Sequence, residues 1–130
     1  MFSAEQYKGS SLGNKTICLT FDDGPGQTAG NGKGPKTLRL ASYLHEQGIT
    51  ATFFVVGKFA KEYSNILSEL KRLNHIIGNH TYSHPNLGLS NLSDQELIFE
   101  FTATTSLITE NLTNENIFFR APFTANVLQK

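Results

Sequence analysis

The sequence predicts an α/β fold that forms the N-terminal portion of a distorted β/α barrel with parallel strands. Short runs rich in β-branched and aromatic residues alternate with segments whose apolar residues recur at helical spacing. Such alternation implies parallel strands joined by helical crossovers. The chain has 130 residues, whereas a closed eight-stranded barrel typically needs about 250. We therefore expect one partial domain over residues 1–130, with the C-terminal part of the barrel missing.

The first strand is predicted over Thr16–Phe21, and Cys18 in its interior is expected to be buried. The segment Gly24–Pro35 is rich in glycine and proline and predicts a loop. Pro35 can occupy the first turn of a helix, which Gly48 ends.

A second strand is expected over Thr50–Val56 and a second helix over Ala60–Leu73. A short third strand follows at His75–Gly78, where His75 is interpreted as structural because it begins the strand and faces the opposite rim. Ser93 opens a third helix with a capping box, and Ile117–Arg120 is the fourth strand.

Composition narrows the possible partners and sites. Lysine plus arginine equals aspartate plus glutamate, 11 each, which argues against electrostatic binding to nucleic acid or to an anionic membrane surface. Cys18 is the only cysteine, so a disulfide framework and a cysteine-based zinc site are excluded. No apolar run is long enough for a transmembrane segment. Residues 1–14 show no secretory leader. A leader in the full protein would imply an extracytoplasmic or cell-wall-associated location.

Three polar groups follow predicted strands and should meet at one rim, where the carboxyl ends of parallel strands gather. They are Asp22 and Asp23, His80 and His84, and Arg120. Two imidazoles and one carboxylate suit zinc. One aspartate can bind the metal while the other acts as a general base that Arg120 orients through a charge-assisted pair.

Each group also has a simpler interpretation. Asp-Asp-Gly-Pro alone is a common turn, two histidines four residues apart are usually unrelated surface residues, and Arg120 alone is most often a surface charge. Their predicted convergence on one rim favours a metal site.

At these positions the chain resembles the polysaccharide deacetylase family, also called the NodB-homology domain or carbohydrate esterase family four. Thr20–Pro25 reads TFDDGP, the first family motif, and Gly78–Pro85 contains the H-[ST]-x-x-H motif with its usual flanks. Arg120–Phe123 matches the third motif, with phenylalanine where tyrosine is commoner, and Ala51–Val55 resembles the family's second strand. The resemblance runs from about residue 15 to residue 126.

The resemblance implies a role for each matched residue. Asp22 would be the general base, fixed by Arg120. A divalent metal, usually zinc with cobalt or nickel as substitutes, would be held by Asp23, His80 and His84. The backbone N–H of Phe123 would help to bind the oxyanion. Thr81 would brace the metal loop, and Tyr82 and Pro122 would contact substrate.

The implied reaction removes acetyl groups from N-acetylglucosamine units of chitin oligosaccharides or peptidoglycan. The family's catalytic acid is a histidine in a C-terminal motif beyond Lys130, so this chain is expected to be a fragment of low or no activity. Alternatives are an amide or imide hydrolase acting on a non-sugar substrate, a non-catalytic module that binds metal or glycan, and a purely structural fragment. Self-association through the open sheet edge is also expected.

Overall fold

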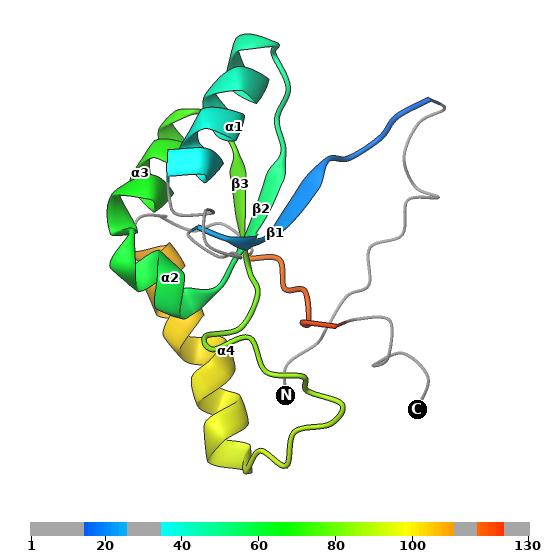
Figure 1. The fold of residues 1–130 in the computed structure, drawn as a ribbon, viewed down its shortest axis with the longest axis vertical. Coiled ribbons are helices and arrows are strands. Elements are labelled where there is room, and N and C mark those ends of the chain that lie inside the picture. The colour runs from blue at the N-terminus through cyan, green and yellow to red at the C-terminus, as the bar shows by residue number, and fades with distance from the viewer. Residues whose placement is uncertain (1–14, 26–34, 111–116, 124–130) are drawn as a thin grey trace.

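The computed structural model describes residues 15–25, 35–110 and 117–123. Three strands and four helices are arranged there with the helices on one side of the strands (Figure 1). Their order along the chain is β1 (Thr20–Gly24), α1 (Pro35–Glu46), β2 (Thr52–Val55), α2 (Gly57–Glu62), α3 (Ser64–Arg72), β3 (Ile76–Asn79) and α4 (Asp94–Thr109). No helix among these residues is long and apolar enough to cross a membrane.

The sheet is parallel, and its strand order β1-β2-β3 follows the order of the chain. Because crossovers between parallel strands are right-handed, an order that never reverses places all the crossover helices on one face. A doubly wound sheet instead reverses its order and carries helices on both faces. The topology is therefore that of a barrel wall, as the sequence predicted.

The core lies between the sheet and the helices. Phe21, Phe53 and Ile77 pair in register across the three strands and face this core. Side chains alternate along a strand, so the next row faces away from the helices, and Ile76 in that row is 40% exposed. The helices contribute mainly aliphatic side chains to the core: Ala41, Leu44, Ile66, Leu67, Leu70 and Ile108.

The first strand was predicted too early in the chain. It begins at Thr20, and Cys18 is exposed rather than buried. The start of β1 is set by its partner strand β2, which begins only at Thr52, and the N–H of Thr52 bonds to the carbonyl of Leu19. Residues before Leu19 have no neighbouring strand among the described residues.

The fourth predicted strand forms only one bridge in the described residues, between Asn79 and Phe119. The direction of that bridge is parallel, as expected. Two hydrogen bonds accompany it, from the N–H of Asn79 to Phe118 and from the N–H of Arg120 to Asn79. The segment 117–120 thus lies beside the carboxyl end of β3.

The second predicted helix is two helices, α2 and α3, which meet at Tyr63. The backbone of Tyr63 is not helical (φ −119°, ψ 48°). The bend directs the buried side chains of α3, Ile66, Leu67 and Leu70, into the core. The sequence did not predict this bend, because most of the apolar residues that indicated the helix lie in α3 and the pattern therefore shows no interruption at Tyr63.

The structural interpretation of His75 is confirmed. The ring is buried, accepts the N–H of Ala51 at Nδ1 (3.2 Å) and donates from Nε2 to the carbonyl of Ala41 (2.9 Å). These bonds join β3 to β2 and α1 at the end of the sheet where β3 begins. Gly48 ends the first helix with φ +68°, also as predicted.

The predicted capping box of α4 is present. The N–H of Glu96 donates to the Ser93 hydroxyl (3.3 Å), and the N–H of Ser93 donates to the Glu96 carboxylate (2.8 Å). The hydrogen bonds from Ser93 lower the pKa of Glu96. The box thus satisfies two donors that the first turn of a helix would otherwise leave free.

We expect Ser93→Ala to lower the free energy of unfolding by about 1 kcal/mol, because it removes the N-cap of α4. The pKa of Glu96 is lowered in the folded state. The difference in the free energy of unfolding between the unmodified chain and Ser93→Ala should therefore be largest at neutral pH and should decrease as the pH falls through that lowered pKa. Urea unfolding at several pH values measures this difference. Gln95→Ala, in the same exposed turn, is the control, and equal losses in both variants would contradict the assignment.

Candidate metal centre

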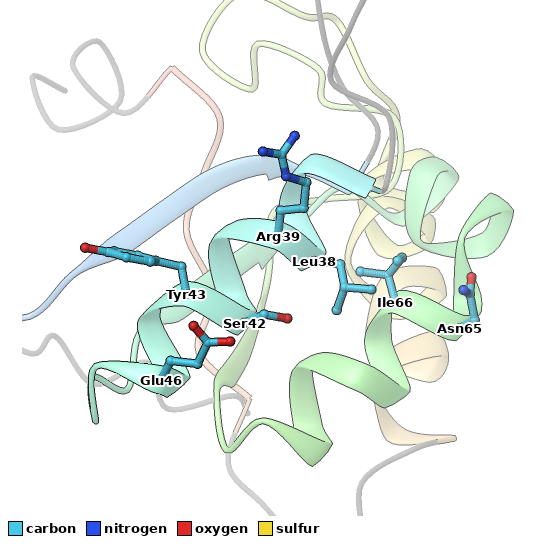
Figure 2. Close-up of a pocket in the computed structure, with 7 residues that line it drawn as sticks. All are labelled: Leu38, Arg39, Ser42, Tyr43, Glu46, Asn65 and Ile66. Carbon is cyan, nitrogen blue, oxygen red and sulfur yellow. The ribbon is translucent and has the colours of Figure 1, made fainter.

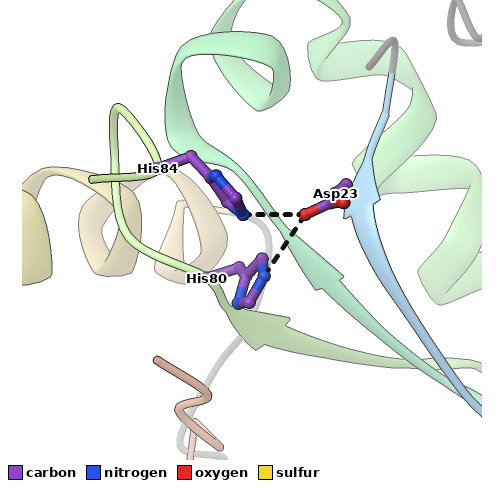
Figure 3. A group of neighbouring side chains, drawn as sticks. All are labelled: Asp23, His80 and His84. Carbon is purple, nitrogen blue, oxygen red and sulfur yellow. Dashed lines mark ion pairs between the residues drawn. The ribbon is translucent and has the colours of Figure 1, made fainter. Parts of the chain in front are cut away.

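Three potential metal ligands meet at the carboxyl ends of the strands. Asp23 lies at the end of β1, His80 directly follows β3, and His84 lies in the loop after it (Figure 3). Asp23 Oδ1 is 3.3 Å from His80 Nε2 and 2.9 Å from His84 Nε2. One ligand atom from each residue falls within 4.8 Å of the other two. The predicted convergence of these three residues is therefore present.

A bulge in β1 separates the two adjacent aspartates. Phe21 pairs with Phe53, but the next paired residue on β1 is Gly24, opposite Val55, so β1 contains one extra residue. Asp23 adopts the left-handed conformation (φ 68°) within this bulge. The side chain of Asp23 in this bulge reaches the two histidines, whereas that of Asp22 pairs with Arg120.

The surroundings of His80 fix the orientation of its ring. The ring is buried, and Nδ1 lies 2.7 Å from the carbonyl oxygen of Arg120. A carbonyl only accepts, so Nδ1 carries a hydrogen, and in the neutral form of the ring Nε2 then has the lone pair that a metal requires. That nitrogen is the one that faces Asp23 (Figure 3).

The loop between the histidines holds two residues in the left-handed region, Thr81 (φ 66°) and His84 (φ 64°). Such conformations cost of the order of 1–3 kcal/mol each and persist only where the surroundings enforce them. The first N–H groups of α2 contribute to this enforcement, since Gly57 donates to the carbonyl of Thr81 and Lys58 to that of Tyr82, both at 2.9 Å.

Thr81 itself is completely buried, and its hydroxyl donates to the carbonyl of His80 (2.6 Å). Its N–H donates to the side-chain oxygen of Asn79 (2.8 Å). The amide nitrogen of Asn79 in turn donates to Phe101 and Thr105 on α4. The loop is thereby tied to α4 as well as to α2.

Asp22 and Arg120 form an ion pair beside Asp23, His80 and His84. Arg120 Nη1 lies 2.8 Å from Asp22 Oδ1 and 2.9 Å from the hydroxyl of Thr20. The guanidinium also lies over the ring of Phe54, 4.2 Å from its centroid. A side chain at Gly78 would overlap that ring, because an added Cβ would stand 2.5 Å from Phe54 Cδ1.

The other predicted site residues lie around this centre. The exposed ring of Phe123 contacts His84 edge to face, with centroids 4.9 Å apart. Tyr82 is half-buried and packs in the same manner on Phe99 of α4. Pro122 is fully buried, so it has no surface with which to contact a substrate.

Two residues of the centre were not predicted from sequence. Asn79 lies inside the second motif but was given no role, and Glu100 accepts hydrogen bonds from the loop that follows His80. A signal for Glu100 exists, because it falls on the buried side of α4 with Thr104 and Ile108. A carboxylate in a buried helical stripe needs a partner.

An open hollow of about 570 Å³ lies elsewhere, between α1 and α3 (Figure 2). Its lining includes Arg39, Tyr43 and Glu46 of α1 and Ile66 of α3. Neither the three candidate ligands nor their immediate partners line it. The group formed by Asp23, His80 and His84 is therefore the better candidate for chemistry.

Known proteins resemble this chain along most of its length. A family model described as polysaccharide deacetylase matches residues 9–127. A chitooligosaccharide deacetylase of Azorhizobium caulinodans is 34% identical over 112 residues, which cover 85% of this chain and 49% of that protein. A peptidoglycan-N-acetylglucosamine deacetylase of Bacillus cereus is 40% identical over 75 residues, 58% of this chain and 25% of that protein.

Among solved structures, the peptidoglycan deacetylase PdaC of Bacillus subtilis matches with a TM-score of 0.69 and 32% identity, over 84% of this chain and 50% of that one. This likeness confirms the predicted fold as part of a β/α barrel. The chain spans about half or less of the length of each of these proteins.

We expect His84→Ala to weaken the binding of Co²⁺ by more than about 100-fold, because even residues that only support metal ligands typically contribute 10- to 100-fold. Titration followed by the visible absorption of Co²⁺ measures the affinity. His45→Ala is the matched control, since His45 lies on α1 and bonds to the carbonyl of Leu73. Equal affinities of the two variants would rule out the proposed ligand set.

Proposed function

Because this chain belongs to the polysaccharide deacetylase family, we propose that it carries the metal and base half of an N-deacetylase active site. The reaction is hydrolysis of the acetamido group of N-acetylglucosamine units in chitin oligosaccharides or peptidoglycan. The observation that supports it most directly is the group formed by Asp23, His80 and His84 beside the Asp22–Arg120 pair. Two of the relatives named above support this substrate class, since one is named as a deacetylase of chitooligosaccharides and the other as a deacetylase of N-acetylglucosamine in peptidoglycan.

We propose Zn²⁺ as the metal, with Co²⁺ or Ni²⁺ as possible substitutes. Two imidazole nitrogens and one carboxylate oxygen are a common set for catalytic zinc, and tetrahedral ligands at about 2.0–2.1 Å stand roughly 3.4 Å from one another. The candidate atoms lie within 4.8 Å of one another, so small side-chain rotations would suffice. When bound, the ion would supply Lewis-acid polarisation of the amide carbonyl and activation of water.

Deprotonation of water and stabilisation of the oxyanion would be carried out by residues of this chain, and the acid half of the site would protonate the leaving amine. Asp22 would take the proton from the attacking water, and Arg120 would orient the carboxylate for that transfer through their 2.8 Å pair. The N–H of Phe123 would donate to the oxygen that becomes negative in the tetrahedral state. Pro122 would act from its buried position by holding the backbone between Arg120 and Phe123.

Sugar recognition would use the exposed rings near the ligands. Phe123 flanks His84 and is 52% exposed, and Tyr82 keeps part of its ring accessible at the edge of the loop. Both rings could pack against the apolar face of a pyranose. A panel of chitin oligomers, peptidoglycan fragments and non-sugar amides or imides would separate the sugar substrates from the alternative substrate class.

Acetate release from N-acetylglucosamine oligomers in the presence of Zn²⁺ or Co²⁺ tests the proposal. We expect Asp22→Asn to reduce release by about 100-fold or more, the usual contribution of a positioned base. Asp94→Asn, an exposed aspartate of α4, is the control. Release that Asp22→Asn leaves unchanged would contradict the role of Asp22, and tight metal binding without any release would indicate a half-site that binds metal but does not catalyse the reaction by itself.

We also propose that the chain self-associates through its open sheet. β1 is an edge strand among the described residues, and Ile76 is exposed on the face away from the helices. The net charge of zero opposes association only weakly.

Sedimentation velocity over a range of concentrations should show dimers or larger species of the unmodified chain, and Ile76→Lys should shift them towards monomer. Ile98→Lys, at a more exposed isoleucine on α4, should have no such effect. A monomer at all concentrations would show that this face does not mediate association.

A further inference from the structure

Glu100 is a buried carboxylate that the proposed chemistry does not use. It lies in the middle of α4 and is 6% exposed. Its two oxygens accept hydrogen bonds from the N–H groups of Tyr82 and Ser83, each at 2.8 Å, and from the hydroxyl of Ser83. All three donors belong to the two residues that stand immediately before His84.

We propose that Glu100 is a positioning residue that sets the place of His84 in the metal centre, an inference that rests on the proposed metal site. The loop is held from two sides. The N–H groups at the start of α2 bond to the carbonyls of Thr81 and Tyr82, and Glu100 bonds to the N–H groups of Tyr82 and Ser83. Removal of Glu100 would leave those N–H groups without their acceptor and release the loop on one side.

The two histidines depend on Glu100 to different extents. His80 has supports of its own, because its N–H bonds to the carbonyl of Val55 and its Nδ1 to that of Arg120. The ring of His84 is less buried, and its own contacts are with Asp23 and the rings of His80 and Phe123. We therefore expect the loss of Glu100 to displace His84 much more than His80.

The decisive property of Glu100 is its capacity to accept hydrogen bonds. A leucine at this position has a similar volume and no acceptor. A glutamine can accept both N–H groups with its amide oxygen and donate from its amide nitrogen to the Ser83 hydroxyl. Glu100→Leu and Glu100→Gln thus separate hydrogen bonding from simple occupancy of the space.

The experiment measures Co²⁺ affinity and the visible spectrum of the bound ion in folded variants of the full chain. We expect Glu100→Leu to weaken binding by about tenfold or more and to change the spectrum, as loss of residues that orient metal ligands typically does. Glu100→Gln should restore most of the affinity. Glu110→Leu, which removes an exposed carboxylate at the end of the same helix, should bind as the unmodified chain does.

A double-mutant cycle distinguishes positioning from general destabilisation. If Glu100 acts through His84, Glu100→Leu should cause no further weakening in a His84→Ala background. Equal weakening in both backgrounds, or unchanged affinity of Glu100→Leu, would overturn the inference. If Glu100→Leu does not fold, Ser83→Ala removes only the hydroxyl contact and should weaken Co²⁺ binding a few-fold. Failure of the unmodified chain and of Glu110→Leu to bind Co²⁺ would refute the metal site itself.

Discussion

The parallel pairing of β1, β2 and β3 in chain order is the constraint on which the rest of the structure depends. It brings the carboxyl ends of β1 and β3 to one edge, although Asp23 and His80 are far apart in the sequence. It also keeps the helices on one side of the strands (Figure 1). Asp22 and Arg120 pair with each other next to this edge. Burial of apolar side chains such as Phe53 and Ile77 stabilises this arrangement, although these residues do not belong to the site.

Within that frame, unusual backbone conformations place the side chains of the centre. Asp23, Thr81, His84 and Phe123 all have positive φ although none is glycine. Such residues cluster where surrounding contacts compensate their strain. Here the compensation is visible for Thr81, whose N–H, carbonyl and hydroxyl all form hydrogen bonds. The loop after β3 is therefore a firmly held segment of the protein and not a simple connection.

Much of this arrangement followed from sequence because its signals are local. The strand-and-helix alternation predicted the parallel sheet, and the positions of Asp23, His80 and His84 after strands predicted their convergence. The features that the sequence did not predict depend on contacts between segments that are distant along the chain. The start of β1 is determined by where β2 begins, the bulge at Asp23 by pairing with Val55, and the exposure of Cys18 by the absence of a neighbouring strand in the described residues. The pattern of α4 shows only that Glu100 is buried, whereas its partners, two N–H groups and one hydroxyl of Tyr82 and Ser83, lie on a separate loop that the pattern does not identify.

Arg120 has two contacts whose combination has a mechanical consequence. Its carbonyl oxygen holds His80, and its guanidinium holds Asp22. A rigid displacement of the segment 117–120 would carry both partners in the same direction, so their mutual spacing would change less than the position of either one. The spacing between Asp22 and His80 therefore depends on a single residue that contacts both of them.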